Sequence, residues 1–392
     1  MGEMFYREGN EHMRIVVAMD SFKGSLTSLQ AGSAVRDGAM KADPSACVAV
    51  CPMADGGEGT VEALRQGLGG DAVTVSVMGP LGASVDAMYC VLPDRRTAVM
   101  EMAAAAGITL VAPQERDVRR ATTFGVGQMI RDAITRGCRH FILGIGGSAT
   151  NDGGTGMLSA LGYDFLDRNG QKIPLGAGGL ERLHRICVEN VLPELAECTF
   201  RIACDVTNPL CGSNGCSAVF GPQKGATSEL IPMLDAWLRN YGKLAKMVSK
   251  KADPDYPGAG AAGGLGFAFL AFTNAALEPG VEIILSETKL EERIRSADLV
   301  VTGEGRLDRQ TVMGKAPVGV ARLAKKHGKK VIAFCGCVGE GAEACLDHGI
   351  DAYFPIVQTS ATLEEALKTE NAYRDLRDTA CGVFRMRFAE NS

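Results

Sequence analysis

Residues 14–23 read RIVVAMDSFK, and this stretch decides the fold. The run at 14–19 is short, apolar and rich in β-branched residues, which is typical of a buried strand. The strand stops at Asp20, and apolar residues then recur at helical spacing over 26–35. A second strand is predicted over 47–51 (CVAVC). The chain therefore opens as strand, helix, strand, the pattern of a parallel sheet covered by helices.

The pattern changes after residue 71. Three strands follow with only turn residues between them, at 73–77, 84–91 and 98–102. Such closely spaced strands predict an antiparallel meander and a second domain. From residue 297 the alternation of strands and helices returns, beginning with a predicted strand over 299–301. The simplest interpretation is an α/β protein in which both chain ends build one doubly wound, parallel-sheet domain, with a second domain inserted into it.

Composition excludes several classes of protein. The 392 residues carry a formal net charge of −5 without a strongly basic run, so we expect no nucleic acid partner. The uncharged stretch 256–277 is crowded with Gly and Ala, and we reject it as a membrane span. Thirteen cysteines without zinc-site spacing, and no targeting signal at residues 1–12, favour reduced thiols in the cytoplasm. Lys315 follows Gly314, but Arg309 and Ala316 occupy the first and last positions of a P-loop pattern, so no P-loop is present, and no protein-kinase loop set is present either.

Three polar loops follow predicted strands of the first domain. In an open parallel sheet such loops meet at the carboxyl edge, where ligands bind. Each pairs carboxylates with glycine or a cation, which suits Mg²⁺ and phosphate, although Asp and Gly are also ordinary turn residues. The candidate residues are Asp20, Ser21, Lys23, Asp55, Gly56, Gly57, Glu304, Arg306 and Asp308.

The stretch 144–154 reads GIGGSATNDGG and follows a predicted strand. Glycines there allow backbone N–H groups to approach a phosphate closely. The candidate binding residues are Gly146, Gly147, Ser148, Thr150 and Asn151. The same string satisfies the dinucleotide pattern G-x-G-x-x-A, which leaves an NAD-dependent dehydrogenase as an alternative. Glycines at 153, 154 and 156 disfavour the helix that this alternative requires.

Two further segments carry polar candidates. ACDVTNP at 203–209 follows a predicted strand, and Asp205 is either a metal ligand, a base or an ordinary Asx-turn residue. FGPQKG at 220–225 places Lys224 in a rigid turn, where it is a candidate phosphate contact.

Seven segments in this order resemble the bacterial glycerate kinase type 1 family over nearly the whole chain from Met13. They are DSFKGSLTS (20–28), PMADGGEGT (52–60), GIGGSATNDGG (144–154), CDVTNPLCG (204–212), FGPQKGA (220–226), GAGAAGGLG (258–266) and TGEGRLDRQTVMGKAPVGVA (302–321). The resemblance implies ATP-dependent phosphorylation of D-glycerate with Mg²⁺, usually to 2-phosphoglycerate. It also implies a flavodoxin-like domain, residues 1–74 plus 288–392, and an inserted mixed-sheet α/β domain, residues 75–287, with the active site in the cleft between them.

The chemistry of phosphoryl transfer distributes hypothetical roles among these residues. Lys23 and Arg306 would neutralise the glycerate carboxylate or the γ-phosphate. Asp205 or Asp20 would accept the hydroxyl proton, and Glu304 and Asp308 would hold Mg²⁺ or orient cations. A non-catalytic sensor of glycerate or nucleotide is a further alternative. We expect a monomer or homodimer.

Overall fold

The computed structural model describes residues 12–54, 59–357 and 362–388. The chain splits into two compact units. The first takes the described residues of Met1–Asp55, Glu62–Gly67 and Val281–Ser392, and the second those of Gly56–Val61 and Leu68–Gly280. Both ends of the chain therefore contribute to the first unit.

The first unit contains a five-stranded sheet, and its neighbouring strands pair in parallel. Its strands are β1 (Arg14–Met19), β2 (Cys47–Val50), β11 (Leu299–Leu307), β12 (Lys330–Val338) and β13 (Ala352–Pro355), in the order β13-β12-β11-β1-β2. Numbered within this unit, the order is that of flavodoxin-like sheets, and the strand order reverses between β1 and β11. The doubly wound domain predicted from the sequence is confirmed.

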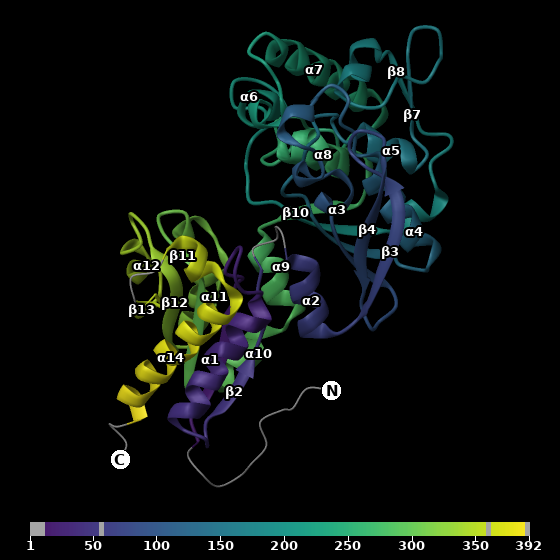
Figure 1. The fold of residues 1–392 in the computed structure, drawn as a ribbon. Helices are drawn as coiled ribbons and strands as arrows, with labels where there is room; N and C mark the ends of the chain where they lie inside the picture. The colour runs from purple at the N-terminus through teal and green to yellow at the C-terminus, as the bar shows by residue number, and fades with distance from the viewer. Residues whose placement is uncertain (1–11, 55–58, 358–361, 389–392) are drawn as a thin grey trace. The chain divides into compact units, whose positions relative to one another are not determined.

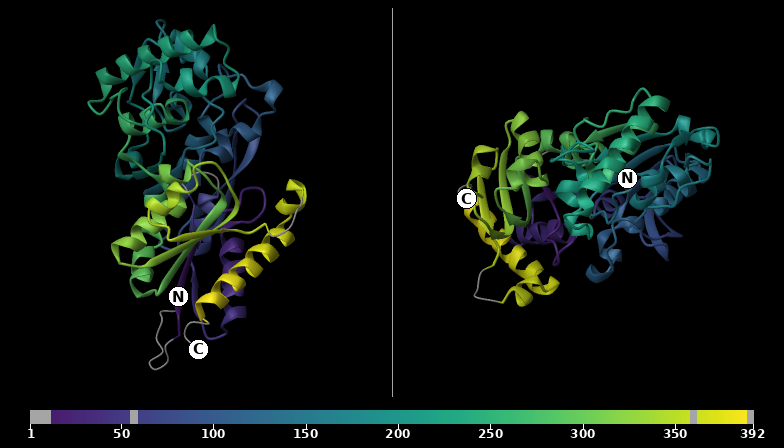
Figure 2. Two further views of the ribbon diagram at one scale, coloured as in Figure 1. Left: turned by 90° about the vertical axis from the view of Figure 1, so that its left-hand side faces the viewer. Right: turned by 90° about the horizontal axis from the view of Figure 1, so that it is seen from above.

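Helices α1 (Ser28–Ala42), α10 (Leu290–Ser296), α11 (Ala316–Lys326) and α14 (Thr369–Phe388) pack against this sheet. The unit also contains α2 (Thr60–Leu68), α9 (Gly280–Glu287), α12 (Ala344–Asp347) and α13 (Leu363–Leu367), in whole or in part. Helices α1 and α14 lie side by side (Figures 1 and 2), and Ile15, Val17 and Met19 share a core with them. Val16 and Ala18 point to the other face and are also fully buried. Strand β1 is therefore buried on both faces, as its apolar sequence predicts.

Strand β11 is longer than its apolar run. The sequence predicts a strand over 299–301 followed by a polar loop, but β11 continues to Leu307 and pairs with β12 as far as Val338. Gly303 makes this possible, because a Cβ atom there would lie 1.9 Å from the carbonyl oxygen of Phe334. The glycines that resemble a loop in the sequence instead allow a close approach between two strands.

The second unit contains a six-stranded mixed sheet in the order β10-β9-β6-β5-β4-β3. Strands β3 (Asp71–Met78), β4 (Ser84–Val91) and β5 (Thr97–Glu101) are antiparallel to one another, which confirms the predicted meander. Strands β6 (His140–Gly144), β9 (Thr199–Ala203) and β10 (Ala275–Glu278) add parallel pairs beside β5. Strands β7 (Asp164–Leu166) and β8 (Arg185–Cys187) form a separate antiparallel pair.

The second unit has its own core. Its helices are α3 (Ala103–Ala106), α4 (Phe124–Thr135), α5 (Thr155–Ala160), α6 (Cys216–Phe220), α7 (Leu230–Val248) and α8 (Ala261–Phe272). The rings of Phe141 and Phe200 stack at 4.7 Å between centroids, and Tyr241 meets Phe267 edge-on at 5.3 Å. No helix in the described ranges combines the length and the apolar character needed to cross a bilayer.

Helix α8 begins with a left-handed segment. Ala262, Gly263 and Gly264 have φ values of 52°, 66° and 90°. The N–H of Gly153 donates to the carbonyl oxygen of Gly263 at 2.9 Å, and the N–H of Gly260 donates to that of Asn208. A Cβ atom on Gly263 would lie 2.1 Å from the carbonyl oxygen of Thr150. The segment thus supports the loops that follow β6 and β9.

Two substitutions test this segment. We expect Ala262→Gly to stabilise the protein by about 0.5–1 kcal/mol, because the left-handed conformation costs alanine more than glycine. We expect Gly263→Ala to destabilise it by about 2–3 kcal/mol or more, because the new Cβ atom overlaps backbone. Shifts of the urea unfolding midpoint measure both effects. A Gly263→Ala protein as stable as the wild type would contradict this description.

Candidate active site

The first group of candidate residues lies where the strand order of the first unit reverses. Asp20 follows β1 directly, is 5 % exposed, and its N–H donates to the carbonyl oxygen of Gly303 at 2.9 Å. A tight turn follows, in which Phe22 and Leu26 exchange two backbone hydrogen bonds. This turn places the exposed Lys23 at its tip. We call Asp20, Ser21, Lys23, Glu304, Arg306 and Asp308 the switch-point group.

Strand β11 brings the acidic half of this group beside the Lys23 turn. A Cβ atom on Gly305 would lie 3.3 Å from the Cα of Phe22 and 3.4 Å from the nitrogen of Lys23, so the two backbones nearly touch. Glu304 is 7 % exposed, and its Oε1 accepts a hydrogen bond from Thr311 Oγ1 at 2.7 Å. Its Oε2 lies 3.5 Å from Lys315 Nζ. Burial raises the pKa of Glu304, and these two donors oppose that effect.

Arg306 is exposed at the edge of the group, and Asp308 beside it is half-buried. Arg306 Nε lies 3.2 Å from Asp308 Oδ2, and the N–H of Gln310 donates to Asp308 Oδ1 at 2.8 Å. The N–H of Asp308 donates to Thr311 Oγ1 at 3.1 Å, so Thr311 bridges Glu304 and Asp308. The sequence reasoning missed Thr311, which carries no local signal. It noticed Lys315 only as the lysine of an incomplete P-loop pattern.

The donor set fits Mg²⁺ in one specific way. Within the described ranges, no three His, Cys, Asp or Glu residues lie together as a metal site. Mg²⁺ commonly binds one or two carboxylates and completes its shell with water and substrate phosphates. Glu304 and Asp308 supply two carboxylates near the end of β11, and Thr311 connects the Glu304 carboxylate to the backbone N–H of Asp308, so the pair fits that mode.

The second group lies in the other unit, at the carboxyl end of β6. Residues 145–154 connect β6 to α5, and we call them the glycine loop. The loop is held by a hydrogen bond from the N–H of Ile108 to the carbonyl oxygen of Gly147 and by one from Ala149 to Ala106. Gly146 and Gly147 are exposed, and Gly147 has a φ of 71°. Among the residues that the structure describes, the N–H groups of Gly146, Gly147 and Ser148 have no acceptor.

Thr150 and Asn151 lie beneath this exposed backbone. Both are 0 % exposed. Asn151 Nδ2 donates to Ser217 Oγ at 2.9 Å. A direct contact with a ligand therefore falls first to Gly146, Gly147 and Ser148, with Thr150 and Asn151 as supports.

Lys224 reaches the glycine loop from below. It ends the short turn 222–224 behind Pro222, which agrees with the predicted rigid turn, and it is 2 % exposed. Its Nζ donates to Ser148 Oγ and to the carbonyl oxygen of Thr150, both at 2.7 Å. Burial lowers the pKa of Lys224 to about 8.

Asp152 anchors the end of the loop. It is fully buried and accepts hydrogen bonds from the N–H groups of Thr123 at 2.8 Å, Gly154 at 3.0 Å and Gly156 at 3.3 Å. Thr123 Oγ1 also donates to it at 3.0 Å. These contacts tie the loop to the starts of α4 and α5. The sequence analysis did not select Asp152 as a candidate, because only its position within the segment 144–154 points to it.

Asp205 follows β9 and is exposed at the same carboxyl edge as the glycine loop, since Ala203 pairs with Gly144. Its Oδ1 accepts a hydrogen bond from the N–H of Gly280 at 3.1 Å. The structure thus places Asp205 with the glycine loop and Asp20 with the switch-point group. Asp55, Gly56 and Gly57 lie outside the described residues.

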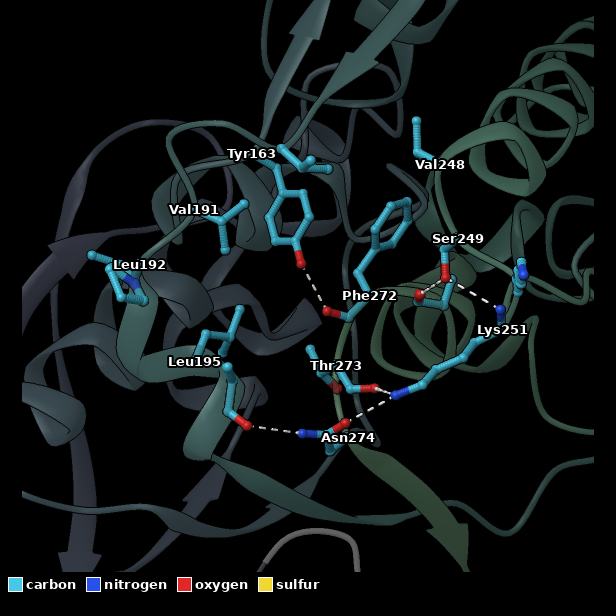
Figure 3. A pocket seen from close by; sticks show the side chains of 15 residues that line it. Tyr163, Val191, Leu192, Leu195, Val248, Ser249, Lys251, Phe272, Thr273 and Asn274 are labelled. Carbon is cyan, nitrogen blue, oxygen red and sulfur yellow. Dashed lines mark hydrogen bonds between the residues drawn. The ribbon is translucent and has the colours of Figure 1, made fainter.

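A separate hollow of about 750 Å³ lies elsewhere in the second unit (Figure 3). It adjoins Asn274, which precedes β10, and so lies at the amino ends of the strands. Tyr163 OH donates to the carbonyl oxygen of Phe272 at 2.7 Å, and Lys251 Nζ donates to Asn274 Oδ1 at 2.9 Å. These side chains are thus bonded within the protein, and ligands of parallel sheets bind at the opposite edge.

Taken together, a flavodoxin-like sheet with cations and carboxylates at its switch point, and an inserted unit with an open glycine loop, define an α/β phosphotransferase. Comparison with known proteins identifies the family within this class. The model of the glycerate kinase family matches residues 15–387.

Individual relatives match over almost their full length. A glycerate kinase from Halalkalibacterium halodurans is 47% identical over 90% of this chain and 93% of its own. A glycerate 2-kinase from Escherichia coli is 45% identical over 91% of this chain and 93% of its own. A crystal structure of a candidate glycerate kinase 2 from Salmonella typhimurium LT2 has a TM-score of 0.90 and 46% identity, covering 97% of this chain and 100% of that one.

The chain belongs to the glycerate kinase family. Membership gives it glycerate kinase activity, which is ATP-dependent phosphoryl transfer. This outcome confirms the resemblance drawn from the seven segments and favours the kinase over the dehydrogenase and the sensor.

The bridge through Thr311 leads to a prediction about Glu304. Thr311→Val removes a donor to its carboxylate, so the charged form loses stabilisation and the pKa of Glu304 rises further. Thr311→Ser keeps the hydroxyl and should leave this pKa near its wild-type value. A titration of ¹³C-labelled glutamate carboxyls by NMR measures the shift. An unchanged titration in the valine variant would show that the hydroxyl does not stabilise the carboxylate.

Proposed function

We propose that this protein transfers the γ-phosphate of ATP to D-glycerate and releases 2-phospho-D-glycerate. One observation carries the proposal: the switch point of the parallel sheet gathers Lys23 and Arg306 with Asp20, Glu304 and Asp308. Glycerate carries a carboxylate that needs a cation and a hydroxyl that must lose a proton, and this group offers both partners. The 2-position is favoured because the Escherichia coli relative is named a glycerate 2-kinase.

The proposed reaction divides the work between the two groups. In the second unit, the N–H groups of Gly146 and Gly147 and the hydroxyl of Ser148 bind phosphate oxygens of ATP, since exposed glycine backbone approaches an anion closely. In the first unit, Lys23 and Arg306 neutralise the glycerate carboxylate or the γ-phosphate. The cleft expected between the two domains remains a prediction.

Transfer needs one bond to form and one to break. The C2 oxygen of glycerate attacks the γ-phosphorus, its proton passes to the carboxylate of Asp205 or Asp20, and the bond to the bridging oxygen breaks to release ADP. Glu304 and Asp308 would hold Mg²⁺, which supplies positive charge to the phosphate oxygens. In this reaction the protein contributes mainly by positioning the reactants and stabilising charge, because phosphoryl transfer requires little covalent chemistry from the protein.

A cytoplasmic location is part of the proposal. All thirteen cysteines are free thiols, which agrees with a reducing compartment. Whether the protein is a monomer or a homodimer remains a prediction.

Phosphorus NMR tests the reaction. Purified protein with MgATP and D-glycerate should produce ADP and one new phosphomonoester whose proton coupling identifies the 2-phosphate, while L-glycerate should give much less product. A 3-phosphate signal would refute the assigned position. Absence of turnover with both enantiomers would refute the substrate.

Substitution of the two aspartates identifies the base. If Asp205 accepts the proton, Asp205→Asn lowers kcat by on the order of 10²-fold or more, and Asp20→Asn produces the same loss if Asp20 has that role. Asp86→Asn is the matched control, because Asp86 is an exposed carboxylate on β4 of the second unit. Steady-state kinetics with saturating ATP measures the effect. Wild-type kcat in both variants would remove both aspartates from the mechanism.

A further inference from the structure

Lys224 is a buried cation with an unusual set of partners. Among the described residues, its ammonium hydrogen-bonds only to neutral oxygens, the Ser148 hydroxyl and the Thr150 carbonyl. The titratable groups that face it are Asp152 and the thiol of Cys216, and within the described residues no hydrogen bond joins either of them to the ammonium group. Burying a charge without a close counter-charge costs folding free energy. A contribution to the stability of the fold therefore does not by itself explain this lysine.

The position of Nζ also sets the direction of one hydrogen bond. An ammonium group has donors and no acceptor, so Ser148 Oγ must accept from it. The hydroxyl proton of Ser148 is then directed elsewhere. Within the described ranges no protein acceptor takes that proton, and Ser148 stands next to the exposed N–H groups of Gly146 and Gly147.

We propose that Lys224 is a positioning residue that makes Ser148 a hydrogen-bond donor to a phosphate of the nucleotide. Lys224 itself does not contact the nucleotide in this proposal, because its Nζ donates hydrogen bonds to Ser148 and Thr150 on the buried side of the loop. The inference rests on the proposed function, since it assumes that the glycine loop binds the phosphates of ATP.

Loss of the lysine proton would allow the hydrogen bond to reverse. A neutral amine keeps two N–H donors and gains a lone pair, and this lone pair can accept the Ser148 proton and so compete with the ligand for it. Burial lowers the pKa of Lys224 to about 8, so the reversal falls within an accessible pH range. Burial raises the pKa of Cys216 to about 11, which keeps the thiol neutral there. Burial raises the pKa of Asp152, but it accepts hydrogen bonds from five N–H and O–H donors, which favour the charged carboxylate.

Calorimetric titration of the intact protein with MgADP between pH 6.5 and 9.5 tests the proposal. Ser148→Ala and Lys224→Met should each weaken binding by about 10-fold or more at pH 7. The double variant should bind no more than a few-fold worse than either single variant, because both remove the same donor. The wild-type affinity should fall above about pH 8, and this fall should vanish in Ser148→Ala.

The controls separate the possible failures. Lys246→Met removes an exposed lysine on α7 and should bind MgADP as the wild type does. Two results would overturn the role of Lys224. One is a loss of MgADP affinity in the double variant equal to the product of the two single-variant losses. The other is a fall in affinity above pH 8 in Ser148→Ala like that of the wild type. If Lys224→Met does not fold, the pH profile of Ser148→Ala alone decides. Failure of the wild type to phosphorylate D-glycerate would instead overturn the proposed function.

Discussion

The pairing of β1 with β11 is the constraint on which the first unit depends. These strands lie at opposite ends of the chain, and their register aligns Ile15 with Leu299 and Met19 with Gly303. Thr302 Oγ1 donates to the carbonyl oxygen of Ala18, and Arg14 pairs with Asp298 at the other end of the strand. Closing a long loop costs entropy that grows only slowly with its length, so a self-folding insertion is tolerated between two such strands.

This pairing also assembles the chemistry. Because the two strands are parallel, their carboxyl ends coincide, and Asp20 and Lys23 meet Glu304 and Arg306 there. The inserted unit has the same arrangement, because the parallel strands β6 and β9 bring the glycine loop and Asp205 to one edge of its sheet. Each unit thus presents polar residues at the carboxyl edge of its own parallel strands, and the substrates of a kinase can be divided between them.

Sequence reasoning predicted these strand ends well because buried parallel strands leave a plain apolar signature. It failed on β11, where Gly303 and Gly305 resemble a loop but serve a close approach to β12. It did not anticipate the left-handed start of α8, since Ala262 has no local preference for that conformation. Lys224 was correctly placed in a rigid turn, but only the three-dimensional structure shows that its ammonium points beneath the loop.

The proposed reaction requires that the glycine loop binds the nucleotide and that the switch-point group binds glycerate. Hydrogen exchange measured by mass spectrometry tests it directly, with MgADP and D-glycerate added separately. The account predicts that MgADP slows exchange at residues 145–151, and that D-glycerate slows it around 20–23 and 304–308. The reverse pattern, with MgADP protecting only the switch-point segments, would contradict it.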